Sequence, residues 1–330
     1  MLSSWSRFAS FLIASNIVLT GAIAQSGAMT TPGWPNQPVR LVVGFPAGSS
    51  PDLTARALAE PLAKALGQPV LVDNKVGAAG NIAADHVAKA TDNHTLGLMI
   101  NGNMTIARLL NPRLPYDPLT DLTPVSLIGV SPLVLCAPAN APGTSAEEFL
   151  AAARAAGNRW NYGTPGVGTV GHLGMELFKA RTGTAAVHVP YPGYPQVTTA
   201  MIAGDLQLSL LPPALATAQV KAGKLRAIGV TASTRSALVP DLPSLAEAGV
   251  KDFNLEIWNA VAAPNSLPKP VVARLSALVA EIVRSPEMRQ KLLTQGWQVV
   301  GSSGEDLASR VRLDTAALGN IITSQGIKAE

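Results

Sequence analysis

The chain has 330 residues, of which 47% are hydrophobic and 14% are charged, and its formal net charge is +4. This length suits two medium domains or one large domain. The weak charge with scattered basic residues excludes a nucleic-acid-binding surface, and the one cysteine, Cys136, excludes an intrachain disulfide, a thiolate zinc site and an iron–sulfur cluster.

Residues 1–24 have the features of a secretory signal peptide. Arg7 supplies a positive charge, residues 8–23 are largely apolar, and Ala22-Ile23-Ala24 is a small-x-small cleavage site before Gln25. Four polar residues interrupt a run that is already short for a membrane anchor, which is the alternative interpretation. We therefore expect export to the periplasm with cleavage near Ala24/Gln25. Because Arg7 is the one charged residue removed, the net charge falls from +4 to +3.

Strands and helices alternate along the next part of the chain. A buried-type strand over 39–45 leads into the glycine-rich turn Phe45-Pro46-Ala47-Gly48-Ser49-Ser50-Pro51-Asp52. Asp52 is the natural N-cap of a helix over 52–66, which ends at Gly67. A strand over 69–72, a glycine turn at 77–81, a helix to about residue 90 and a strand over 95–100 follow. This order is typical of an α/β domain.

The chain then crosses to a second α/β region and returns. We place the first crossing at 123–137, where prolines separate two apolar stretches, and the return at 253–263. The elements expected between them are helices over 146–156, 170–181 and 197–203 and strands over 160–162, 186–189, 206–210 and 225–230. Helices over 270–284, 286–295 and 305–322, with a short strand at Val299, should pack back on the first region. We predict a discontinuous lobe 1 (35–130 and 255–330) and a lobe 2 (131–254), hinged about a cleft.

A second glycine-rich turn, Gly163-Thr164-Pro165-Gly166-Val167-Gly168-Thr169-Val170-Gly171-His172, also follows a strand and opens a helix. Exposed N–H groups at a helix N-terminus, with the helix dipole and nearby hydroxyls, bind anions without a basic side chain. Ligand sites favour domain interfaces and the carboxyl ends of strands. The two turns lie at such ends, one in each lobe, so we expect them to face each other across the cleft.

Several motifs in order resemble one family. They are Trp34-Pro35, Pro38-Val39-Arg40-Leu41-Val42-Val43, Phe45-Pro46-x-Gly48-x-x-x-Asp52, Gly77-Ala78-x-Gly80-Asn81, Leu114-Pro115-Tyr116-Asp117-Pro118, Asn161-Tyr162, Gly166-x-Gly168-x-x-x-His172-Leu173, His188-Val189-Pro190-Tyr191, Lys221-Ala222-Gly223-Lys224-Leu225-Arg226-Ala227 and Pro240-Asp241-Leu242-Pro243-Ser244. Through nearly all of its mature length the chain resembles the Bug-type (TctC-like) solute-binding receptors of tripartite tricarboxylate transporters. The resemblance implies a monomeric, two-lobe α/β periplasmic binding protein of type II, a "Venus flytrap". Such a receptor closes on a small carboxylate without a cofactor and presents it to membrane permease subunits.

The resemblance also implies that backbone N–H groups and hydroxyls of the two turns hold the carboxylate, partly through water. The candidates it gives are Phe45, Ala47, Gly48, Ser49, Ser50 and Asp52 in the first turn, Asn101 after the strand over 95–100, and Thr164, Gly166, Val167, Gly168, Thr169 and His172 in the second turn. We expect Asp52 to cap its helix, since its carboxylate would repel an acid. We expect His172 to support its turn.

The distal end of the pocket departs from the family. The family's Tyr-x-Gly-Gly turn reads Tyr191-Pro192-Gly193-Tyr194 here, and Leu211-Pro212-Pro213 stands where many relatives carry an aspartate that can pair with a ligand ammonium. An ammonium without such a partner is costly to desolvate. If Tyr191, Gly193, Tyr194 and Leu211 line this end, the ligand is an acid without positive charge and with an apolar or aromatic part. The alternative is that Tyr194 points to solvent and Leu211 only packs.

Other functions fit the sequence less well. Gly166-x-Gly168-x-x-Gly171 matches a dinucleotide fingerprint, but the next strand ends in Pro190-Tyr191 where an acidic residue would bind the ribose. A secreted hydrolase using Ser49 or Ser50 with His172 would lack a Gly-x-Ser-x-Gly elbow, and the four histidines have no metal-binding spacing. A ligand-loaded receptor that signals to a sensor kinase, in place of a transporter, stays open.

Overall fold

The computed structural model describes residues 33–328, so the predicted signal peptide lies outside the described residues. The strands are β1 (Val39–Val43), β2 (Val70–Asn74), β3 (Thr95–Ile100), β4 (Leu122–Pro132), β5 (Val134–Pro138), β6 (Asn161–Thr164), β7 (Val187–Pro190), β8 (Ser209–Leu211), β9 (Leu225–Val230), β10 (Glu256–Pro264) and β11 (Gln298–Val299). The α-helices are α1 (Ser50–Leu66), α2 (Asn81–Ala88), α3 (Ala107–Leu110), α4 (Ala146–Ala156), α5 (Val170–Thr182), α6 (Tyr194–Ala203), α7 (Pro213–Lys221), α8 (Lys269–Arg284), α9 (Pro286–Thr294) and α10 (Gly304–Gln325). Short 3₁₀ turns η1 (Ala78–Gly80) and η3 (Gly157–Arg159) and a π-helical segment η2 (Gly102–Ile106) complete them.

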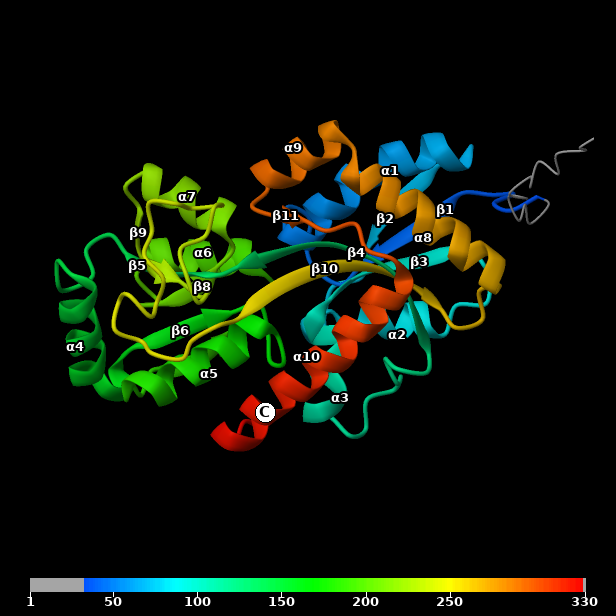
Figure 1. Ribbon diagram of the computed structural model, residues 1–330. Helices are drawn as coiled ribbons and strands as arrows, with labels where there is room; N and C mark the ends of the chain where they lie inside the picture. The colour runs from blue at the N-terminus through cyan, green and yellow to red at the C-terminus, as the bar shows by residue number, and fades with distance from the viewer. Residues whose placement is uncertain (1–32, 329–330) are drawn as a thin grey trace, which may run out of the picture. The chain divides into compact units, whose positions relative to one another are not determined.

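A six-stranded sheet with the order β11-β4-β10-β3-β1-β2 forms the larger layer (Figure 1). β1 pairs in parallel with β2 and β3, whereas β10 runs antiparallel to β3 and β4. Successive side chains of β1 alternate between two cores: Leu41 and Val43 pack in the cluster that includes α1 and α8, and Val42 packs in the cluster that includes α2 and α10. Because both faces are covered, β1 is apolar and buried at every position except Arg40.

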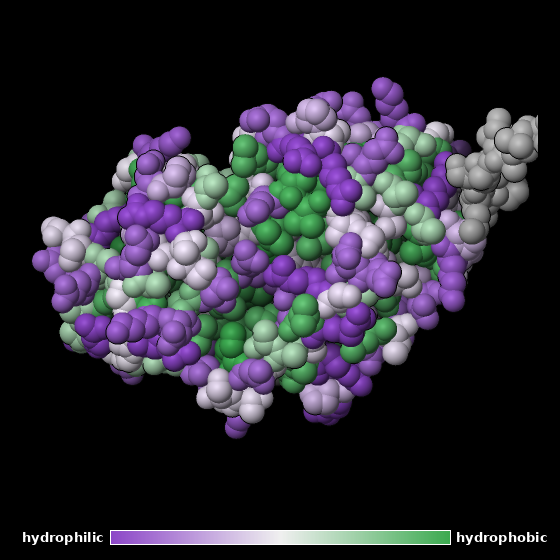
Figure 2. All heavy atoms as spheres, viewed as in Figure 1, coloured by the Kyte–Doolittle hydropathy of each residue, from purple (hydrophilic) through white to green (hydrophobic). Residues whose placement is uncertain are grey.

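Two smaller sheets, β8-β5-β9 and β6-β7, share a third hydrophobic core with α4, α5 and α6. β5 begins two residues after β4 ends, and the chain comes back to the larger sheet at β10. The division of the strands between the larger sheet and the two smaller sheets is therefore compatible with the predicted lobes. The boundaries of the lobes stay a prediction. Apolar residues gather around a hollow near the middle of the face shown in Figure 2.

The last helix, α10, contributes to two of the three cores. Leu307 and Val311 pack in the core beneath the larger sheet, whereas Leu318 and Ile322 belong to the core of the smaller sheets, where α10 meets α5. The expectation that the C-terminal helices pack on the first region holds for the first half of α10. Its second half packs on the second region.

Two helical segments were absent from the sequence-based prediction. The segment η2–α3 follows β3 directly, and α7 follows β8. The sequence carries no helix prediction after Pro212, but Pro213 stands at the first position of α7, where a missing N–H costs nothing. Its fixed backbone angle starts the helix.

Candidate functional site

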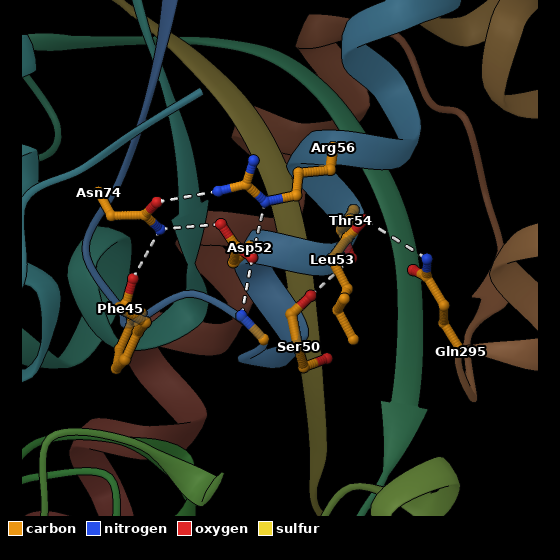
Figure 3. A network of polar contacts seen from close by, with 9 residues as sticks. Phe45, Ser50, Asp52, Leu53, Thr54, Arg56, Asn74 and Gln295 are labelled. Carbon is orange, nitrogen blue, oxygen red and sulfur yellow. Dashed lines mark hydrogen bonds and ion pairs between the residues drawn. The ribbon is translucent and has the colours of Figure 1, made fainter. Parts of the chain in front are cut away.

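The first glycine-rich turn is held by Asp52 (Figure 3). The carboxylate accepts hydrogen bonds from the Gly48 N–H (2.8 Å), Asn74 Nδ2 (2.9 Å) and Arg56 Nε (3.0 Å). The prediction that Asp52 is the N-cap is wrong. The helix begins two residues earlier, with Ser49 at the N-cap position, because Pro51 is well tolerated in a first helical turn. Asp52 reaches back from the third helical position and closes the turn.

The same contacts set the ionisation of Asp52. Burial acts to raise the pKa of its carboxyl group, but the hydrogen bonds from Arg56, Asn74 and Gly48 outweigh burial, so the pKa lies below its ordinary value. Asp52 therefore stays charged in the folded protein. Its carboxylate oxygens accept hydrogen bonds from protein donors.

This lowered pKa predicts a loss of stability in acid. A group with a depressed folded-state pKa stabilises the fold above its unfolded pKa, near 4, and the contribution disappears as the pH falls through the folded value. We expect Asp52→Asn to lower the free energy of unfolding by about 2 kcal/mol at pH 7. The difference from the wild type should be constant above about pH 5 and should begin to shrink as the pH falls below about 4. Urea titrations between pH 3 and 7 measure it.

The exposed Asp205, whose carboxylate makes no hydrogen bond with residues 33–328, provides the matched control for this measurement. Asp205→Asn should leave the stability unchanged at every pH. A pH-independent effect of Asp52→Asn would contradict the role of its charge.

The second turn is held by hydrogen bonds between its own side chains and its backbone. Thr169 is the N-cap of α5: its Oγ1 accepts from the His172 N–H (3.3 Å) and donates to the Gly166 carbonyl (2.8 Å). His172 Nδ1 accepts from the Gly168 N–H (3.4 Å), and its ring stacks on His188 at 4.5 Å. The buried His172 thus lies in contact with the backbone of its turn.

Glycines bring the second turn into contact with two segments of the first region. A Cβ atom at Gly102, which follows β3, would lie 2.9 Å from the Gly168 carbonyl oxygen. A Cβ at Gly166, whose φ is +119°, would lie 2.9 Å from Cβ of Ala79. These approaches leave no room for a side chain, so the second turn lies directly against η1 and the segment after β3.

A cavity lies where these elements meet, and we call it the central cavity. Its volume is about 40 Å³, which is room for roughly three waters. It is lined by Phe45, Ser49, Ser50, Pro51, Ile100, Asn101, Pro165, Thr169, Val170, Gly171, Tyr194, Ile257, Trp258, Asn259 and Trp297. None of these residues is charged.

Three helices begin at the central cavity. Ser50 is the first residue of α1, Val170 and Gly171 are the first two of α5, and Tyr194 is the first of α6. N–H groups at these positions have no acceptor within their own helix, and the helix dipole places partial positive charge there. With no carboxylate among the lining residues, the cavity is suited to a small anion.

Two residues that line the central cavity each have a buried polar side-chain atom without a hydrogen-bond partner among residues 33–328: Ser49, at Oγ, and Trp297, at Nε1. Most buried polar atoms in folded proteins are paired, so an orphan beside a cavity calls for an explanation. The other lining amides are at least partly satisfied: Asn101 donates to the Glu256 carbonyl (3.0 Å) and Asn259 to Thr54 Oγ1 (2.9 Å).

The central cavity gathers six of the predicted site residues: Phe45, Ser49, Ser50, Asn101, Thr169 and Tyr194. The others lie around it or elsewhere: Ala47, Gly48, Asp52, Thr164, Gly166, Val167, Gly168, His172, Tyr191, Gly193 and Leu211. Tyr194 is 9% exposed and does not point to solvent, and burial raises the pKa of its phenol. Leu211 is fully buried in the core of the smaller sheets, so the alternative that it only packs fits its position.

A second, larger cavity of about 250 Å³ adjoins the first. It shares Ser49, Ser50 and Tyr194 with the central cavity and extends to Gly48, Leu53, Pro195, Pro212, Ala214, Leu215, Ala218, Thr294 and Gln295. The three shared residues separate the two spaces, and most of the additional lining is apolar.

Sequence reasoning missed the contribution of β10 and of the turn after α9. Ile257, Trp258 and Asn259 enter the cavity from β10, and Trp297 enters after Gly296. One signal was available: a buried asparagine inside an otherwise apolar strand, at 259, marks a polar group with a specific partner.

Between residues 33 and 328, no helix has an apolar stretch long enough to cross a bilayer. Within the part of the chain that the structure describes, His, Cys, Asp and Glu side chains form no cluster that could hold a metal ion.

Comparison with known proteins gives a consistent result. Residues 54–327 match the model of the tripartite tricarboxylate transporter family receptor, TctC. Protein BugT of Bordetella pertussis is 32% identical over 281 residues, covering 84% of this chain and 86% of BugT. Among solved structures, Rpa4515 of R. palustris with adipate (TM-score 0.86, 33% identity, 89% and 99% of the two chains) and MatC of Rhodopseudomonas palustris with bound malate (0.83, 30%, 88% and 100%) are similar. So is the periplasmic binding protein BugD (0.85, 28%, 90% and 100%).

Proposed function

Because the chain belongs to the tripartite tricarboxylate transporter receptor family, we propose that it captures a small carboxylate in the periplasm and delivers it to transporter permease subunits. The family assignment and the α/β periplasmic binding protein fold, both predicted from the sequence, are confirmed. The family is one of binding receptors, so the chain is not an enzyme.

The observation that carries the proposal is the meeting of three helix N-termini at an uncharged cavity. A carboxylate there would receive hydrogen bonds from the free N–H groups of Ser50, Val170 and Gly171. Hydrogen bonds to charged groups contribute about 1.5–3 kcal/mol each, so a few of them supply most of the roughly −8 kcal/mol of micromolar binding.

The lining favours an acid that carries no positive charge. An ammonium in the central cavity would meet no carboxylate, and its desolvation would go uncompensated. The phenol ring of Tyr194 and the apolar walls of the second cavity suit an apolar or aromatic part beyond the carboxylate. The relatives named with malate and adipate likewise hold acids without an ammonium group.

We propose that binding is coupled to closure about the passages β4–β5 and β9–β10. A ligand that touches both glycine-rich turns stabilises the state in which Gly102 meets Gly168. The central cavity has room for about three waters, whereas malate has nine non-hydrogen atoms. The central cavity therefore suits one carboxylate group, and the rest of the acid would extend towards the second cavity.

Isothermal titration calorimetry tests the proposal. The panel is succinate, malate, adipate, benzoate, nicotinate, aspartate and glutamate. We expect at least one acid without an amino group to bind in the micromolar range and the two amino acids to bind far more weakly. Tight binding of an amino acid alone would contradict the proposed ligand class. Deleting the gene and measuring uptake of the bound acid tests delivery.

A further inference from the structure

Trp297 is the one lining residue of the central cavity that comes from the C-terminal part of the chain beyond β10. Two residues after α9 ends at Thr294, Gly296 forms a left-handed turn (φ +85°): the Gly296 N–H donates to the Leu293 carbonyl and the Trp297 N–H to the Leu292 carbonyl, both at 2.9 Å. This is a Schellman turn, and it fixes the direction in which Trp297 leaves the helix. A Cβ at Gly296 would lie 3.0 Å from the Ala214 nitrogen, so the turn also touches the start of α7.

The indole of Trp297 differs from those of two other tryptophans in the described residues. Trp34 Nε1 donates to the Asn93 carbonyl at 2.8 Å, and Trp258 Nε1 donates to Asp314 Oδ2 at 2.7 Å. Trp297 is 2% exposed, and its Nε1 is buried without an acceptor among residues 33–328. A buried indole N–H normally finds a partner, because leaving it unpaired costs the desolvation of the group.

The missing partner has a defined chemistry. An indole N–H only donates, so its partner must carry an acceptor atom, whereas the unpaired Ser49 hydroxyl can donate as well as accept. Both side chains line the central cavity, where the helix N-termini favour an anion. A carboxylate oxygen meets the requirement of both groups and of the helix ends.

We propose that Trp297 is a ligand-binding residue whose Nε1–H, together with Ser49 Oγ–H, donates to an oxygen atom of the bound acid. The inference rests on the proposed function, since it takes the occupant to be an acid. It adds a donor from outside both glycine-rich turns. It also makes the empty closed state unfavourable, because two polar groups are then sealed without partners.

The substitution Trp297→Phe removes the N–H and keeps most of the ring. With succinate, malate, adipate and benzoate as the probes, we expect the affinity of the acids that bind the wild type to fall about 10- to 100-fold. The melting temperature of the empty protein should stay the same or rise, since an unpaired buried donor is lost. Ser49→Ala should lower affinity in the same way.

Trp34→Phe is the matched control, because Trp34 lies outside the lining of both cavities and its N–H is paired. It should lower the melting temperature and leave the affinity for the same acids within twofold of the wild type. The two variants are thus expected to show opposite signatures, which a general loss of packing at Trp297 would not produce.

A second measurement needs no change at Trp297. In ¹⁵N-indole NMR spectra of the wild-type protein, assigned by substitution of the other tryptophans, saturation with a binding acid should shift the Trp297 resonance and slow its exchange with water. Unchanged affinity in Trp297→Phe with an unmoved indole resonance would overturn this inference alone. If no acid of the panel binds the wild type, the inference and the proposed function both fall.

Discussion

Replacing Gly102 by alanine should weaken acid binding roughly 30-fold while the empty protein stays folded and at least as stable. The backbone of Gly102 does not have a positive φ, so alanine fits it without strain. The new methyl group would lie 2.9 Å from the Gly168 carbonyl oxygen, and backbone atoms there cannot step aside as a flexible side chain would. Overpacking of this kind costs about 2 kcal/mol. It destabilises only the state in which Gly102 contacts Gly168.

Gly319→Ala in α10 is the matched control, because its Cβ would make only an ordinary contact, 3.4 Å from Leu109 Cδ1. Alanine there should raise helix stability by about 1 kcal/mol and leave affinity unchanged. Calorimetry with malate and adipate measures the affinities, and small-angle scattering of the loaded proteins reports their compactness. Equal affinity in wild type and Gly102→Ala would show that the turn contact is absent from the bound state.

Replacing Tyr194 by alanine should change which acids bind. Tyr194 separates the central cavity from the second cavity, so its removal joins about 40 Å³ to about 250 Å³ of largely apolar space. We expect the ratio of affinities for adipate and malate to move at least tenfold towards the longer adipate. Loss of a buried aromatic ring should also lower the free energy of unfolding by about 3–5 kcal/mol.

Tyr194→Phe separates the ring from the hydroxyl. The ring still divides the cavities, so the ratio of affinities should remain that of the wild type, even if the hydroxyl contributes to binding. Competition calorimetry at 15 °C, where the less stable variant stays folded, gives both ratios. An unchanged ratio in Tyr194→Ala would mean that the second cavity takes no part in ligand selection.

The elements that the sequence predicts best are those with clear periodicity and clear ends. β3 and β9 were predicted to the residue, because apolar runs there are bounded by polar or glycine-containing segments, and α4 has a capping box in which Ser145 and Glu148 cap each other. α7 was missed because its alanine-rich sequence carries little amphipathic contrast. The start of α1 was misplaced because two candidate N-caps, Ser49 and Asp52, lie three residues apart.

The glycine-rich turns could be found from sequence because their chemistry is local. Each needs small residues, a capping hydroxyl or carboxylate and a following helix, all within ten positions. The rest of the central cavity is not local. Trp258 and Asn259 reach it only because β10 inserts between β3 and β4, and Trp297 reaches it through the turn at Gly296. Strand order over such separations leaves no short-range pattern in a sequence.

Helix α10 constrains the direction in which the glycine-rich turns can separate. Its first half packs with Leu307 and Val311 under the larger sheet, and its second half packs with Leu318 and Ile322 against α5. A motion that parts Gly102 from Gly168 must either expose Leu318 and Ile322 or rotate about an axis that passes close to them. The rotation keeps their apolar surface away from water and is therefore favoured. The C-terminal helix would then lie close to the axis of the proposed hinge motion. The ligand entrance would open on the side away from this helix.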